Sequence, residues 1–188
     1  MHEIGLRILL AYICREAAKY DLGMNPILSY ATDHYMRTYL QMKSGVEEAN
    51  HTISQIKTIP ADFPFLNNTS DKEIGPLYMG KIQSASIIKH IRSMVFQKTF
   101  GSKHEMLSLL NLLEEEAEAP AFFYTINTIA SALKTSAPSR KTLFQRLEDQ
   151  GFFVCRTHHN PTGFKTNATK EDIIKVFTMT NTSSKMKE

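Results

Sequence analysis

The amino-acid sequence predicts an α+β protein, in which a helix, several strands and further helices follow one another. Three observations predict this fold class. Apolar residues recur with helical spacing near the start, a segment rich in Tyr, Thr and Leu follows with rough alternation, and the last third mixes helical and strand-like stretches. The chain has 188 residues, of which 42% are hydrophobic and 22% charged, and this is enough for a core of ordinary size.

The first part of the chain reads as one helix followed by strands. Residues 2–22 show helical periodicity, and Gly23 is expected to end that helix because glycine is common at helix C-termini. The stretch 27–42 predicts one long strand or two short ones, and residues 51–58 predict another short strand.

The middle of the chain reads as a linker and two helices. Residues 59–81 are rich in Pro, Gly and Asn, so we expect a connecting region and a domain boundary there. Apolar stripes predict helices over 82–99 and 103–118, and Pro120 is expected to end the second one.

Residues 122–177 give the clearest pattern. Helix, turn, helix, strand, turn and strand follow one another, which is the order of a winged helix-turn-helix. In this interpretation the turn Asn160–Gly163 is the tip of the wing. The expected elements are helices over 125–134, 140–150 and 170–177, and strands over 152–157 and 164–167.

Positive charge gathers on this unit. Between Ser136 and Lys170 there are six basic and two acidic residues, so the segment carries a formal charge of +4, whereas the whole chain carries +3. A charge run is most often an ordinary solvated face. Together with the helix-turn-helix order, however, the concentration of charge indicates a protein that binds a polyanion such as a nucleic acid.

The histidines and the acidic residues do not predict a metal or catalytic centre. His158 and His159 are neighbours, and neighbours on a strand point to opposite faces, so we expect no metal site there. The same alternation argues against a direct dyad of Asp33 and His34. The eight glycines form neither GxGxxG nor GxxxxGK[ST], so no nucleotide-binding loop is visible.

Composition indicates a cytoplasmic protein. Cys14 and Cys155 form no CxxC pair and are expected to be free thiols. The apolar run Ile8–Cys14 is far shorter than the roughly 20 residues that span a bilayer. Glu3 and Arg15 do not fit a signal peptide, so we expect no membrane partner.

Four segments resemble a known family. Residues 2–40, Gly75–Gly80 (GPLYMG), Glu114–Ala121 (EEEAEAPA) and Arg156–Ala168 (RTHHNPTGFKTNA) are similar, in this order, to segments of the tRNA (guanine(26)-N2)-dimethyltransferases. The last segment is the most specific, since it matches the family's Arg-Thr-His-x-x-Pro-x-Gly-Ile-Lys-Thr-Asp-Ala closely. The resemblance covers nearly the whole chain.

The resemblance implies an organisation and a cofactor. Members carry an S-adenosylmethionine domain ahead of these segments, so the chain is expected to be the C-terminal half of such an enzyme. Residues 1–58 would be the tail of a class I methyltransferase domain, 59–81 a linker in place of a cysteine knuckle, and 82–188 the tRNA-binding domain with its winged-helix-like unit. The cofactor site would lie outside this chain, on a separate core polypeptide or on a longer reading frame, and the chain is not expected to methylate alone.

The resemblance also implies roles for particular residues. Basic side chains on the second helix and the wing would grip the tRNA backbone: Arg140, Lys141, Arg146, Arg156, His158 and Lys165. Asp33, His34 and Arg37 would line or brace the methyltransferase active site, or only hold a sheet edge. No zinc is implied, because the knuckle cysteines are absent.

Two other interpretations stay open. The winged-helix order also fits a DNA-binding regulator, although residues 1–58 resemble neither a dimerisation nor a ligand domain. The chain would otherwise be an inactive fragment with exposed apolar side chains near its start.

Overall fold

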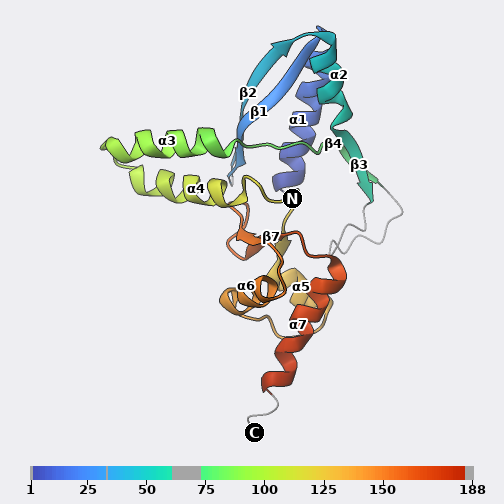
Figure 1. Ribbon diagram of the computed structural model, residues 1–188, viewed down its shortest axis with the longest axis vertical. Helices are drawn as coiled ribbons and strands as arrows, with labels where there is room; N and C mark the ends of the chain where they lie inside the picture. Colours follow the sequence, from blue (N-terminus) through green and yellow to red (C-terminus); the bar gives the residue numbers. More distant parts are fainter. Residues whose placement is uncertain (1, 33, 61–72, 185–188) are drawn as a thin grey trace.

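The computed structural model describes residues 2–32, 34–60 and 73–184, with side chains described up to residue 179. Helices and strands are mixed along the chain (Figure 1). The helices are α1 (His2–Ala18), α2 (Val46–Ser54), α3 (Ala85–Gln97), α4 (Lys103–Glu116), α5 (Ile126–Ala132), α6 (Arg140–Asp149) and α7 (Lys170–Ser184). The strands are β1 (Leu22–Ala31), β2 (Met36–Ser44), β3 (Ile56–Pro60), β4 (Glu73–Tyr78), β5 (Tyr124–Thr125), β6 (Val154–Arg156) and β7 (Gly163–Thr166).

Helix α1 packs against the antiparallel hairpin β1–β2 and against β4. Its buried face carries Leu6, Leu10 and Cys14, which form a core with Met24 of β1 and Tyr78 of β4. Of the two alternatives for residues 27–42, two strands are confirmed, although they extend beyond that range: β1 and β2 pair from Leu22–Ser44 to Ala31–Met36.

Two predictions for the first part are wrong. Residues 51–58 were expected to be a strand, but helix α2 runs to Ser54 and β3 begins at Ile56. Glu47 and Glu48 stand in the first turn of α2, where carboxylates favour a helix through its dipole. The expected linker 59–81 contains β4, which pairs with β3 and sends Tyr78 into the core.

The end of α1 also differs from the prediction. Asp21, with φ of 54°, takes the left-handed conformation after the helix, three residues beyond Ala18. Gly23 lies inside β1 and does not cap the helix. A Cβ atom on Gly23 would lie 2.6 Å from the backbone of Glu48, so glycine is needed there for close packing of β1 against α2.

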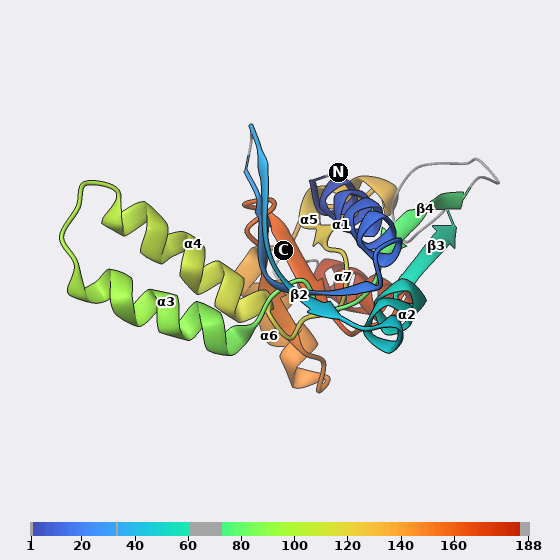
Figure 2. The same cartoon turned by 90° about the horizontal axis from the view of Figure 1, so that it is seen from above.

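Helices α3 and α4 form an antiparallel arm that extends away from the rest of the molecule (Figures 1 and 2). The arm is joined to the body at its base, where Leu28 of β1 packs with Ile88, Leu110 and Leu113. Both helices were predicted within a few residues, because their apolar stripes are regular.

The C-terminal unit contains α5, α6, α7 and a small sheet of order β5-β7-β6. Its core surrounds Phe164 of β7, which packs against Leu143 and Leu147 of α6 and Phe177 of α7. The side-chain oxygens of Thr125 and Ser139 accept hydrogen bonds from backbone N–H groups and so begin α5 and α6. The predicted helices and strands of this unit follow in the expected order, but the short strand β5, which pairs with β7, was not predicted.

The two cysteines are free and buried. Burial raises the pKa of Cys155 to about 12, and it raises the pKa of Cys14 above its ordinary value, so neither thiol is a nucleophile near neutral pH. None of the helices in the described ranges has the length and apolar content that a membrane span requires.

Candidate functional site

Two features of the structure bear on function, and both involve the segment around β6 and β7. One is a buried group of ionisable side chains, which we call the ionic cluster: Glu3, Arg7, Glu116, His158, His159 and Lys165. The other is an open groove between α6 and β6, which carries basic and aromatic side chains.

Glu3 is the centre of the ionic cluster. Its Oε1 atom accepts hydrogen bonds from Arg7, from Lys165 Nζ at 3.0 Å and from the backbone N–H of Phe122 at 2.8 Å. Arg7 also donates to the carbonyl oxygens of Tyr78 at 2.7 Å and Gly80 at 3.3 Å. Burial alone would raise the pKa of Glu3, but Lys165, Arg7 and these hydrogen bonds lower it to about 2.

Glu116, at the end of α4, contacts the segment that follows β6. One carboxylate oxygen accepts from Thr157 Oγ1 at 2.8 Å, and the other contacts His158 Nδ1. The Nε2 atom of His158 in turn accepts the backbone N–H of Ala31 at 3.3 Å, so this ring carries its proton on Nδ1. His158 therefore connects the segment after β6 to β1 and α4.

The His159 ring is buried within the cluster, and neither of its nitrogens has a hydrogen-bond partner among the described residues. Its ring stacks on Phe123 with 5.5 Å between centroids, and its Nε2 atom lies 3.9 Å from Glu3 Oε2. Burial, reinforced by His158, lowers the pKa of His159 to about 3 even though the two carboxylates oppose that shift. His159 is therefore neutral at physiological pH.

The expected separation of His158 and His159 is wrong. Strand β6 ends at Arg156, so strand alternation does not apply to the turn, and the two rings lie with centroids 3.8 Å apart. Ligand atoms of both histidines and of Glu116 lie within 4.8 Å of one another.

These atoms do not fit a metal centre well. The Nδ1 proton of His158 is already bonded to Glu116, and Arg7 and Lys165 balance the charges of Glu3 and Glu116. A divalent cation would leave two uncompensated positive charges in a buried site. We therefore assign the cluster to holding the fold together.

Two of the predicted phosphate-binding residues have a different role. The side chains of Lys165 and His158 are 3% and 1% exposed and contact carboxylates, so neither can reach a phosphate. Sequence reasoning placed Lys165 at the surface because it flanks the predicted turn 160–163, but β7 is the central strand of its sheet and all its residues are buried.

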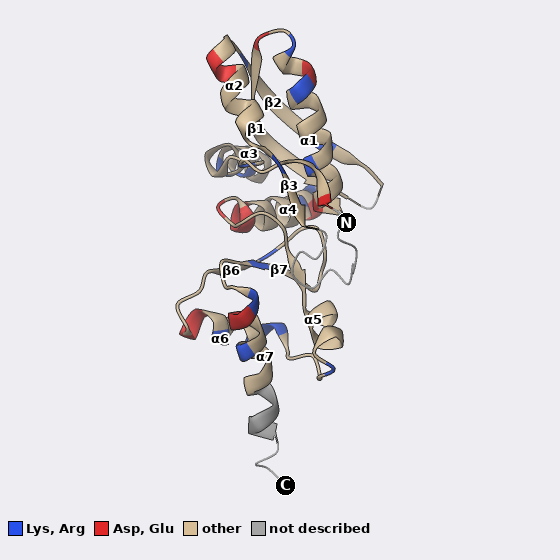
Figure 3. Ribbon diagram, turned by 90° about the vertical axis from the view of Figure 1, so that its right-hand side faces the viewer, with Lys and Arg blue, Asp and Glu red and all other residues tan. Residues whose placement is uncertain are grey.

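The groove holds most of the other predicted residues. It has a volume of about 700 Å³ and is lined by Glu115, Arg140, Lys141, Phe144, Phe153, Val154, Cys155 and Arg156. Arg140 and Lys141 are exposed on the first turn of α6, and Arg156 forms a two-pronged ion pair with Glu115 of α4. Lys and Arg lie along β6, β7 and α6 in Figure 3. Arg146 lies outside this set, because it is half-buried and donates to the carbonyl oxygen of Val176 at 3.4 Å.

The residues expected to support an active site lie elsewhere. Asp33 falls outside the described residues. His34 and Arg37 are exposed at the β1–β2 turn, and the Arg37 guanidinium stacks over Tyr35 at 5.1 Å. They do not contact the groove or the ionic cluster through any described interaction, so their active-site role stays a prediction.

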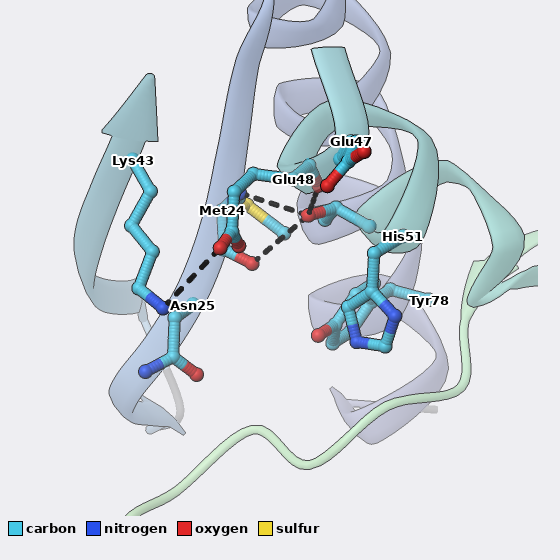
Figure 4. Close-up of a pocket in the computed structure, with 8 residues that line it drawn as sticks. Met24, Asn25, Lys43, Glu47, Glu48, His51 and Tyr78 are labelled. Atoms are coloured by element: carbon cyan, nitrogen blue, oxygen red, sulfur yellow. Dashed lines mark hydrogen bonds and ion pairs between the residues drawn. The ribbon is translucent and has the colours of Figure 1, made fainter. Parts of the chain in front are cut away.

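A second pocket lies at the other end of the molecule, beside α2 (Figures 1 and 4). It has a volume of about 500 Å³, and its wall includes Lys43, Glu47, Glu48, His51 and Tyr78. Lys43 forms an ion pair with Glu48 at 3.7 Å, and Thr52 bonds to Met24 and Glu48. Because its charges have both signs and pair with one another, this pocket favours no particular ligand.

Sequence reasoning missed several residues of these features. Glu3 and Glu116 were not singled out, although Glu116 stands in the acidic segment that carries the family resemblance. Phe144 and Phe153 were given no role in binding. Both phenylalanines lie within four residues of a basic residue in the sequence, and this pattern could have indicated a binding surface.

Comparisons with known proteins give a consistent result. The chain matches the family model for N2,N2-dimethylguanosine tRNA methyltransferase over residues 1–63 and 65–178. The tRNA (guanine(26)-N(2))-dimethyltransferase of Thermococcus kodakarensis is 36% identical over 174 residues, which cover 89% of this chain and 46% of that protein. The corresponding protein of Methanobrevibacter smithii is 32% identical over 201 residues, covering 96% and 52%.

A solved structure has a similar fold. Trm1 from Pyrococcus horikoshii, in complex with S-adenosyl-L-methionine, superposes with a TM-score of 0.85 at 31% identity. The match covers 93% of this chain and 49% of that one. The mixed helix and sheet fold is thus shared, and the chain spans about half the length of the relatives it matches.

Proposed function

Because the chain belongs to the N2,N2-dimethylguanosine tRNA methyltransferase family, we propose that it binds tRNA for methylation of the exocyclic amine of a guanine. Its C-terminal unit acts as a winged-helix-like module, with α5 and α6 as the helix pair and β6 and β7 as the wing. The observation that carries this proposal is the basic groove beside α6, where Arg140 and Lys141 are exposed at the start of the helix. The grip is electrostatic, because phosphate contacts supply affinity for RNA whatever its sequence.

We propose that the exposed basic residues at the start of α6 carry most of this grip. Arg140 and Lys141 are both exposed, so each can contact a phosphate from solvent. Arg156 lies on the same groove, with its guanidinium fixed by Glu115. Lys165 and His158 act indirectly, because they anchor the wing to α1 and α4.

The methyl donor of the proposed reaction is S-adenosylmethionine, which is bound in the related Pyrococcus horikoshii structure. In the described residues, the glycines face this chain's own atoms or open space, and none forms a cradle for a bound nucleotide. At Gly23, for example, the place of a Cβ atom is filled by Glu48. We propose that the cofactor site lies outside the described residues, and we assign no step of methyl transfer to them.

A titration tests that part of the proposal. If the cofactor site lies outside the described residues, as we propose, S-adenosylmethionine injected into this chain alone should give no saturable heat in isothermal titration calorimetry. Under the same conditions a full-length relative is the positive control. Saturable binding to this chain would place the cofactor site within it and contradict the proposal.

Replacing Lys141 with glutamine should weaken tRNA binding and flatten its salt dependence. Each phosphate contact contributes roughly 0.7–0.9 to the slope of log K against log salt, so the slope should fall by about that amount. The measurement is filter binding of a tRNA transcript at several salt concentrations. Lys57→Gln is the matched control, since Lys57 is equally exposed but lies on β3, far along the chain from the groove.

Competition distinguishes the proposal from a DNA-binding regulator. We expect unlabelled tRNA to displace labelled tRNA at much lower concentration than duplex DNA of equal length. A preference for duplex DNA would support the regulator, while failure of both nucleic acids to bind would refute the proposed function. The family comparisons give no support to the regulator.

A further inference from the structure

The groove beside α6 is unusual in combining exposed aromatic surface with cations. Phe153 is 41% exposed, although its neighbours Phe152 and Val154 pack against the core. Its backbone is fixed, because its N–H donates to Asn167 Oδ1 at 2.9 Å. An exposed ring on a fixed backbone offers a flat apolar face, and a ligand that stacks on it loses little entropy to ordering of the protein.

The rest of the groove is also held in place. The Phe144 ring packs edge-on against Phe164, with 6.3 Å between centroids, and forms part of the groove wall. Arg140 donates to the carbonyl oxygen of Pro161 at 3.3 Å, and Arg156 is clamped by Glu115. Aromatic and cationic groups thus face one open space of about 700 Å³, within the range of roughly 300–1,000 Å³ that is typical of small-ligand sites.

We infer that this groove binds one unstacked nucleotide of the tRNA, with its base stacked on Phe153 and its phosphate at Arg140 and Lys141. The inference rests on the proposed function and specifies what the site recognises. A base paired inside an A-form helix keeps its faces covered, so aromatic stacking requires a nucleotide from a loop, bulge or end. The positive charges beside the aromatic rings favour a nucleotide over an uncharged apolar ligand, because only the nucleotide carries a phosphate that can bind them.

The chain contains no tryptophan, and this permits a direct test. The variant Phe153→Trp places one fluorophore in the groove, and Phe96→Trp is its matched control. Phe96 is 72% exposed on the arm and faces Lys103 at 5.2 Å, so it is also an exposed ring beside a cation. We expect a tRNA transcript to quench the fluorescence of Phe153→Trp by stacking, and to leave that of Phe96→Trp unchanged at the same saturation.

Removal of the ring gives the second measurement. Stacking of a base on an aromatic side chain contributes enough that Phe153→Ala should weaken tRNA binding by roughly 5- to 150-fold. The slope of log K against log salt should stay the same, since no charge is removed. Phe96→Ala should bind like the unchanged protein, and thermal melting by circular dichroism checks that both variants are folded.

The outcomes separate the inference from the proposed function. If the unchanged protein fails to bind tRNA, the proposed function is refuted. If it binds with a steep salt dependence while Phe153→Ala binds within twofold and Phe153→Trp is not quenched, the groove does not hold a base and only the inference fails. Should Phe153→Ala not fold, the fluorescence of Phe153→Trp alone decides.

Discussion

Replacing Lys165 with methionine should lower the free energy of unfolding by about 3–5 kcal/mol, the usual cost of removing one partner of a buried ion pair. The Lys165 ammonium group lies 3.0 Å from Glu3 and 3.8 Å from Glu116. Methionine would fill a similar volume but would leave Glu116 without a neighbouring lysine, and Glu3 with Arg7 alone as a cationic partner. The loss is therefore electrostatic and does not result from a cavity.

Urea unfolding followed by circular dichroism measures this effect. Lys141→Met is the matched control: it makes the same chemical change on an exposed helix position and should alter stability by no more than about 0.5 kcal/mol. Adding Glu116→Gln to Lys165→Met should recover part of the loss, because one buried negative charge is then removed. A loss below about 1 kcal/mol for Lys165→Met would show that the cluster does not stabilise the fold as described.

The four segments that resemble the family all contribute residues or contacts to the ionic cluster. The segment 2–40 supplies Glu3 and Arg7, and Gly75–Gly80 supplies the carbonyl oxygens that Arg7 binds. The acidic segment supplies Glu116, and the segment 156–168 supplies both histidines and Lys165. All four segments that resemble the family thus meet at the ionic cluster. The predicted tRNA contacts Arg140 and Lys141 lie outside these four segments.

Local features of the fold could be predicted from the sequence. Helices α3, α4, α5 and α6 have regular apolar stripes, and an apolar stripe is a property of neighbouring residues. The stretch 51–58 was misjudged because eight residues are too few to distinguish a helix end followed by a strand from a strand alone. The helix prevailed because α2 packs its Ala49 and Thr52 against the body.

The ionic cluster could not be predicted in the same way. Glu3 and Lys165 are 162 positions apart, and no local pattern indicates that they touch. The sequence offered a charge excess around the wing, and reasoning from that excess placed Lys165 and His158 on the surface. Only the tertiary arrangement shows which basic groups face solvent and which are neutralised by carboxylates from α1 and α4.

Lowering the pH from 7.5 to 5 should reduce the free energy of unfolding by about 2 kcal/mol through His159 alone. Its pKa is about 3 in the folded protein, against an ordinary value of 6.5. Between these values the unfolded chain binds one more proton than the folded protein, so stability falls as the pH falls, by about 1.4 kcal/mol per pH unit. The loss of stability begins near pH 6.5. At pH 5, which is 1.5 pH units lower, it therefore amounts to about 2 kcal/mol.

Glu3 adds a second loss at lower pH. Its pKa is about 2 in the folded protein and 4.5 ordinarily, so its contribution is present above pH 4.5 and disappears as the pH falls toward 2. The variant His159→Asn removes the first loss and keeps the second. Urea unfolding at pH 7.5, 6, 5 and 4 should therefore give a flat profile above pH 5 for His159→Asn and a falling one for the unchanged protein. Equal slopes in both proteins between pH 6.5 and 5 would mean that His159 is protonated in the fold, and that the neighbouring carboxylates of Glu3 and Glu116 outweigh its burial.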